Sequence, residues 1–172
     1  MGVIEEIFNI FAENKFSQKH DISLQKTKLQ RPKEIFIINH PTEFDAELEA
    51  MKYFSAIKTN IEEAKNIEFV LVFVKTKAEI EQYFSSISTA LKGDVILWFA
   101  YPKGTSKKYK VEIGRDYGWD ILGKNDFEAV RAVAIDEDWS TLRFRNVTFV
   151  KSMTRNQKMA MTTEGKSRTE KK

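Results

Sequence analysis

The stretch with the richest chemistry follows an apolar run: it is YPKGTSKKYK, from Tyr101 to Lys110. Its lysines supply positive charge, and the short hydroxyl side chains of Thr105 and Ser106 supply hydrogen-bond donors. A helix that begins just after this stretch adds a partial positive charge at its N-terminus. Together these groups could hold a phosphate or a carboxylate, although a solvated lysine-rich loop has the same composition. The spacing of a phosphate-binding P-loop, Gly-x-x-x-x-Gly-Lys-[Ser/Thr], is absent.

A second polar stretch follows the first apolar run, EIFIIN, and contains Asn39, His40 and Thr42. These side chains could contact a small ligand, but no Gly-x-Gly-x-x-Gly is present to hold a dinucleotide phosphate. The chain has two histidines, and His20 falls in a polar linker, so we expect no two-histidine metal site. For His40 a hydrogen-bonded loop histidine is favoured over a catalytic base.

Charged residues also gather around a hairpin predicted near the end of the domain. The carboxylates of residues 136–138 are expected to form its turn and to stay in water, rather than to hold a metal. With a three-residue loop, Arg143 lies opposite Arg131, and facing like charges destabilise a sheet unless a carboxylate or an anion lies between them. We therefore expect Asp116 to pair with a hairpin arginine such as Arg143. A bound ligand anion is the alternative.

Aromatic residues alternate with lysines in this part of the chain, so Tyr101 and Tyr109 could stack on nucleobases. Trp98 lies in the middle of an apolar strand, where core packing is the better explanation. Positive charge gathers elsewhere: residues 151–172 carry seven lysines and arginines and two glutamates, a net charge of +5. Because the whole chain has a net charge of +3, residues 1–150 sum to −2. Association with nucleic acid is therefore expected only through the tail.

The elements that must position these residues follow from apolar periodicity. Apolar runs predict strands at residues 34–39, 53–59, 67–74, 95–101, 127–135 and 140–147. Helices are expected at 42–51, from the capping box at Thr76 to Gly93, and at 112–122, where Gly114 and Gly118 would pack closely on the sheet. This order predicts a three-layer, Rossmann-like α/β fold. Its sheet is mostly parallel, has about five to six strands and ends in an antiparallel hairpin.

Length and composition set the remaining expectations. A chain of 172 residues with 42% hydrophobic residues is sufficient for one domain with a substantial core. No run is long enough to span a membrane, no secretory signal is recognisable, and the absence of cysteine excludes disulfides. We expect a cytoplasmic protein with an amphipathic N-terminal helix and polar linker at 1–33, one α/β domain at 34–150 and a basic, disordered tail at 151–172. The N-terminal helix could dock on the domain or on a second copy, which leaves a homodimer open.

Four stretches, FVKTKAEIE, LWFAYPKGTS, RDYGWDIL and VRAVAIDEDWSTLRFR, resemble a family of small bacterial proteins grouped as a domain of unknown function. The family pattern contains Leu-Trp-x-Ala-[Tyr/Trp]-Pro-Lys and Val-x-x-x-Ala-[Ile/Val]-Asp-x-x-Trp-Ser-x-Leu-Arg-Phe, and the likeness covers residues 35–145. The resemblance implies a compact Rossmann-like domain, similar to a reduced methyltransferase fold, and implies no activity. Two features depart from the pattern: Asn39-His40 replaces an expected glycine, and the loop after Lys103 is richer in lysine.

These observations favour a binding domain over an enzyme, with no cofactor. It would recognise a small anionic ligand or an acidic partner at the YPKGTS loop. The alternatives are a degenerate methyltransferase-like enzyme, which rests on fold analogy alone, and nucleic-acid association through the tail. No catalytic residue and no metal site is predicted. The candidate ligand-binding residues are Tyr101, Lys103, Thr105, Ser106, Lys107, Asp116, Arg143, Asn39 and His40.

Overall fold

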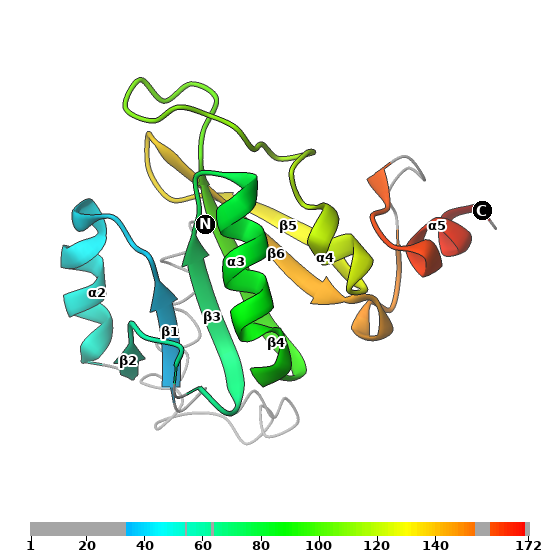
Figure 1. Ribbon diagram of the computed structural model, residues 1–172, viewed down its shortest axis with the longest axis horizontal. Helices are drawn as coiled ribbons and strands as arrows, with labels where there is room; N and C mark the ends of the chain where they lie inside the picture. Colours follow the sequence, from blue (N-terminus) through cyan, green and yellow to red (C-terminus); the bar gives the residue numbers. More distant parts are fainter. Residues whose placement is uncertain (1–33, 54, 63, 154–158, 171–172) are drawn as a thin grey trace, which may run out of the picture.

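A computed structural model describes residues 34–53, 55–62, 64–153 and 159–170. The expected N-terminal helix and linker lie outside these residues. As far as residue 146, helices and strands follow one another in the predicted order, and a helix that was not predicted comes after them at residues 163–170 (Figure 1). The elements are β1 (Glu34–Ile38), η2 (Thr42–Phe44), α2 (Asp45–Lys52), β2 (Ala56–Lys58), β3 (Ile67–Phe73), α3 (Lys77–Ile87), η3 (Ser88–Ala90), β4 (Leu91–Pro102), α4 (Asp120–Lys124), β5 (Phe127–Ala134), β6 (Trp139–Asn146), η4 (Val147–Phe149) and α5 (Thr163–Glu170).

The six strands form one sheet in the order β2-β1-β3-β4-β6-β5. Strands β2, β1, β3 and β4 are parallel, and β6 runs antiparallel to both of its neighbours, β4 and β5. Strand β3 is buried at six of its seven positions, as expected for a central parallel strand covered on both faces. The predicted fold class, a mostly parallel Rossmann-like sheet that ends in an antiparallel hairpin, is confirmed.

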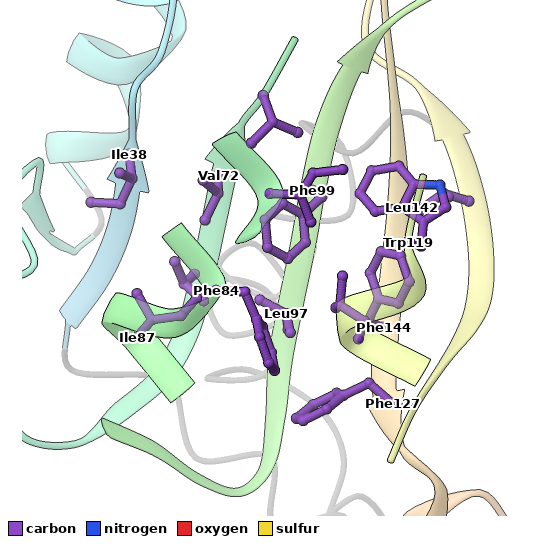
Figure 2. Close-up of a cluster of buried hydrophobic side chains, with 14 of the residues drawn as sticks. Ile38, Val72, Phe84, Ile87, Leu97, Phe99, Trp119, Phe127, Leu142 and Phe144 are labelled. Carbon is purple, nitrogen blue, oxygen red and sulfur yellow. The ribbon is translucent and has the colours of Figure 1, made fainter. Parts of the chain in front are cut away.

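Two apolar clusters cover the two faces of the sheet. On one face, Leu48 and Met51 of α2 pack with Trp98 and with residues of β1 and β3. On the other face, Phe84 and Ile87 of α3 point toward Leu97 of β4, as Figure 2 shows. Helix α3 begins with the predicted capping box, because the backbone N–H of Glu79 donates to the Thr76 hydroxyl at 3.1 Å. It ends at Ile87, earlier than predicted, and Gly93 lies within the first residues of β4.

The predicted helix at 112–122 is wrong: only Asp120–Lys124 are helical. Gly118 has a φ of +98°, a left-handed conformation that breaks the helix. The Trp119 indole N–H donates to the carbonyl oxygen of Gly114 at 2.7 Å, and the Gly114 N–H donates to the Tyr117 carbonyl at 3.2 Å. These contacts fold residues 113–119 into a tight turn, so the two glycines serve the turn and not helix packing.

The expectation of a disordered tail is wrong for residues 159–170, which contain α5 (Figure 1). The cause is Glu128 of β5, which is 1% exposed. Its carboxylate accepts hydrogen bonds from the Thr162 N–H at 2.8 Å, the Thr162 hydroxyl at 2.7 Å and the Met161 N–H at 3.0 Å. A side chain on Gly165 would meet this carboxylate at 2.3 Å, so glycine permits the close approach. The C-terminal segment, residues 159–170, is thereby held against the edge strand.

Candidate functional site at the carboxyl ends of the strands

The strand order places a topological switch point between β1 and β3. The chain leaves β1 through α2 toward β2 on one side, and it leaves β3 through α3 toward β4 on the other. In open α/β sheets, ligands bind in the crevice outside the carboxyl ends of such strands. Here Asn39 follows β1 in a left-handed conformation, with a φ of +55°. Its side-chain N–H donates to the Phe73 carbonyl oxygen at 2.9 Å, which ties the ends of β1 and β3 together.

The long loop after β4 folds back over this edge of the sheet. The ring of Tyr109 packs on Trp139 with 4.9 Å between ring centroids. The Tyr109 hydroxyl donates to the Glu43 carboxylate of η2 at 3.4 Å, and Lys108 forms an ion pair with the same carboxylate. The lysine-rich stretch is therefore a fixed connection from β4 to the end of β1, and not a free loop.

Positive charge gathers over the Tyr109 ring. The ammonium nitrogen of Lys75, which is two residues beyond Phe73, lies 5.3 Å from the ring centroid, and that of Lys108 lies 5.6 Å from it. Cations over an aromatic face are attracted by its negative quadrupole, so the ring helps to hold each of these ammonium groups beside it. Among the described residues, no ion pair includes Lys75 or the exposed Lys107. We call Asn39, His40, Lys75, Lys108 and Tyr109 the strand-end cluster.

Two of the predicted site residues instead hold the loop against the β5–β6 hairpin. The Lys103 ammonium group donates to the Asp136 carbonyl oxygen at 2.6 Å, and the Ser106 hydroxyl donates to the Asp138 carboxylate at 2.7 Å. The Ser106 oxygen also accepts from the Lys108 N–H at 3.1 Å. Thr105 lies beside them and is exposed. Lys103 and Ser106 therefore orient the lysines that follow them.

His40 has a local partner. Its Nε2 atom lies 3.1 Å from the Asp45 carboxylate at the start of α2, and its ring lies 6.5 Å from that of Phe44. The ring is partly buried, whereas the Asp45 side chain is 62% exposed. This is the geometry of the hydrogen-bonded loop histidine favoured from the sequence. Its neighbour Asn39 takes the conformation for which a glycine was expected at this turn.

The remaining predicted residues lie elsewhere. Tyr101 is buried on the α3 face, where burial raises the pKa of its phenol; a hydrogen bond with Ser140 and the nearby Arg115 lower that pKa by less. Asp116 is exposed, and its partner is Arg115 at 3.9 Å.

Arg143 belongs to the opposite face, because its neighbours Leu142 and Phe144 point into the α3-side cluster and successive side chains of a strand alternate. The predicted Asp116–Arg143 pair is therefore wrong.

The hairpin itself has the predicted register. Arg131 lies opposite Arg143, with a bulge between Ala129 and Arg131. The Asp136 carboxylate accepts from the Asp138 N–H at 2.8 Å and from the Trp139 N–H at 2.7 Å, so it forms the turn as expected. Within the described ranges, no group of three histidine or acidic side chains is placed to hold a metal ion, and no helix is long and apolar enough to cross a membrane.

Sequence reasoning missed Lys75 and Glu43, and it gave Lys108 and Tyr109 no place among the site residues. A signal for Lys75 was present, because it comes directly after the apolar run of β3, and the carboxyl ends of parallel strands meet at one edge. Glu43 offered none, since its role depends on where the loop after β4 crosses η2.

Comparisons with known proteins give structural likenesses only. No protein-family model matches the chain, and no curated protein matches it. A SAM-dependent methyltransferase from Aquifex aeolicus is 11% identical, with a TM-score of 0.41 over 66% of this chain and 69% of that one. The N-methyltransferase NodS from Bradyrhizobium japonicum WM9 is 19% identical, with a TM-score of 0.42 over 67% and 75%.

A protein from Sulfolobus solfataricus that has been assigned, but not demonstrated, to be a type 11 methyltransferase is 10% identical. Its TM-score is 0.39 over 72% of this chain and 90% of that one. Likenesses at this level carry nothing about substrate or activity. The strand order and the antiparallel β6 make the chain a reduced, methyltransferase-like Rossmann fold.

Proposed function

We propose that the protein is a binding domain that takes a small anionic ligand, of the phosphate or carboxylate class, at the strand-end cluster. One observation carries the proposal: Lys75 and Lys108, from the loops after two different strands, converge on the ring of Tyr109 beside the switch point. A bound anion would interact favourably with both ammonium groups.

The surrounding residues suit this role. Asn39 and His40 are fixed by hydrogen bonds to Phe73 and Asp45, so these side chains are positioned before a ligand arrives. Lys103 and Ser106 anchor the loop that carries Lys107 and Lys108. Glu43 forms an ion pair with Lys108, and a bound anion would compete with this carboxylate.

The test is a thermal-shift titration of the full chain with pyrophosphate, citrate and S-adenosylmethionine. A ligand at a hundredfold its dissociation constant stabilises a protein by about 2.7 kcal/mol, or roughly 2–4 °C for a chain of this size. We expect pyrophosphate or citrate to raise the melting temperature of the parent, and Lys75→Gln to abolish the increase. The matched control is Lys110→Gln, because this lysine lies in the loop that carries Lys108 and its side chain is 89% exposed.

Removing the charge of the competing carboxylate sharpens the test. Glu43→Gln frees Lys108, so it should tighten anion binding, whereas a ligand that is a cation would bind more weakly to this variant. Absence of any shift with pyrophosphate and citrate, or equal shifts in Lys75→Gln and the parent, would contradict the proposal. A shift with S-adenosylmethionine that survives in Lys75→Gln would favour the methyltransferase-like alternative.

A further inference from the structure

A second concave site lies near the edge strand β5. It is formed by the turn before α4, by α4 and by the C-terminal segment. It is a pocket of about 440 Å³, within the range of small-molecule sites. The turn contributes Arg115 and Tyr117, α4 contributes Lys124, and the C-terminal segment contributes Met159 and Lys166. Its lining includes no residue of the strand-end cluster.

Both walls of this pocket are held by specific buried contacts. The turn is closed by the hydrogen bonds among Gly114, Tyr117 and Trp119 described above, and Trp119 is 4% exposed. The opposite wall is fixed by the carboxylate of Glu128 on Thr162, directly after Met161. A pocket with two such walls is preorganised, which lowers the entropic cost of binding.

Two of the exposed large hydrophobic side chains lie in this pocket. Tyr117 is 58% exposed and Met159 is 42% exposed, and both line this one cavity. Met161 and Ala129 add further apolar lining. A flexible methionine and an aromatic ring in one lining are suited to a flat apolar group, since sulfur and ring faces both pack well on planar systems.

The lining has a net positive charge, because Arg115, Lys124 and Lys166 outnumber Asp116 and Asp120. Asp120 is engaged by Lys77, outside the lining, at 2.5 Å. Asp116 has only the long 3.9 Å contact with Arg115. Lys124 of α4 and Lys166 of the C-terminal segment also line the pocket, and no described ion pair includes either. An anionic group on the ligand would be attracted by both.

From this arrangement we infer that the pocket binds a small ligand with a planar, apolar body and an anionic group. The C-terminal segment supplies one wall, so a bound ligand also holds that segment on the domain. The inference stands apart from the strand-end cluster, because the two sites use different residues and different elements.

The probe is anilinonaphthalene sulfonate, an aromatic anion with a flat naphthalene ring, and N-phenylnaphthylamine is the matched neutral compound. Binding to the full chain carrying methyl-labelled methionine is followed by NMR. The methyl signals of Met159 and Met161 should shift. That of Met51, which is on the buried face of α2, should not. Shifts confined to other methionines, or no binding by the parent, would overturn the inference.

Variants then test the charge. Lys124→Gln with Lys166→Gln should weaken the sulfonate by about five- to tenfold and leave the neutral compound unchanged. The control pair Lys65→Gln and Lys92→Gln, exposed lysines outside the pocket, should leave both unchanged. Asp116→Asn should tighten the sulfonate, because it removes a competing carboxylate. If both double variants bound the sulfonate with equal affinity, or if Asp116→Asn bound it more weakly than the parent, the inference of an anionic ligand would be refuted.

Discussion

Glu128 is a buried carboxylate that holds the C-terminal segment, and Glu128→Gln removes its charge while keeping its shape. In the parent, three donors converge on this side chain: the N–H groups of Met161 and Thr162 and the Thr162 hydroxyl. The carboxylate also faces the N-terminus of α5, where a negative charge is favoured by the helix dipole. Glutamine keeps one acceptor oxygen, but its amide group turns a donor toward the Met161 N–H, which lies 3.1 Å from the second oxygen.

The magnitude follows from the number of charged hydrogen bonds. A hydrogen bond to a charged group contributes about 1.5–3 kcal/mol, against about 1 kcal/mol for a neutral one. Across three donors, the free energy that docks the C-terminal segment should fall by about 2–4 kcal/mol. Because the segment can detach while the sheet stays folded, we expect the loss mainly as local opening.

Limited proteolysis measures this opening. Trypsin cuts after Lys166 and Arg168, and Arg168 is partly protected because its guanidinium donates to the Val150 carbonyl oxygen at 2.8 Å. When opening is fast, cleavage tracks the open population, so a loss of about 2 kcal/mol raises the rate about thirtyfold. Glu137→Gln makes the same change at an exposed hairpin position and should leave the rate unchanged. Equal cleavage rates for Glu128→Gln and the parent would refute the claim that this carboxylate anchors the segment.

Three further perturbations test other parts of the fold. Gly118→Ala should lower the free energy of unfolding in urea by about 1–3 kcal/mol, because φ is +98° and the new Cβ would lie 2.7 Å from Ile113; Gly104→Ala, with open space around it, is the control. Burial raises the pKa of Tyr101, so the phenol ionises first in the unfolded chain, and the free energy of unfolding should fall as pH rises above about 10. Tyr101→Phe should flatten that decline. The same decline with pH in the variant and the parent, measured by urea titration, would contradict this prediction. Lys77 lowers the pKa of Asp120 through their hydrogen bond. The small stabilisation by this exposed pair is therefore present above the carboxyl pKa of the unfolded chain and is lost on acidification. Asp120→Asn should lower the melting temperature at pH 7 in low salt, but not at pH 2 or in high salt.

The sequence predicted the centre of the sheet well because β1, β3 and the second half of β4 are buried on both faces. Runs such as Ile67–Phe73 are almost entirely apolar, and a short apolar run of this kind is typical of a strand that is buried on both faces. The capping box at Thr76 and the hairpin register at Arg131 are equally local signals, and both are confirmed. Local signals of this kind suffice where neighbouring residues decide the conformation.

The sequence was less informative where distant contacts decide. Residues 112–122 have the spacing of a helix, but the turn depends on the Trp119 indole reaching Gly114 and on the left-handed Gly118. The tail carries little apolar surface, and its docking depends on Glu128, one polar residue within a strand. Likewise, Lys75 and Lys108 meet only because the loop after β4 turns back toward η2.

The place of β6 has a consequence for how the protein is made. It is the last strand along the chain, yet it lies between β4 and β5, and among the described strands it is the only neighbour of β5. During synthesis, β4 and its buried aromatic residues therefore emerge with one edge open, and β5 has no strand to join until β6 follows. At about 5–20 residues per second this interval is short but measurable, and an open, apolar edge is prone to pair with other chains. Ribosome-bound chains that end before Trp139 should accordingly be the species that depend most on chaperones.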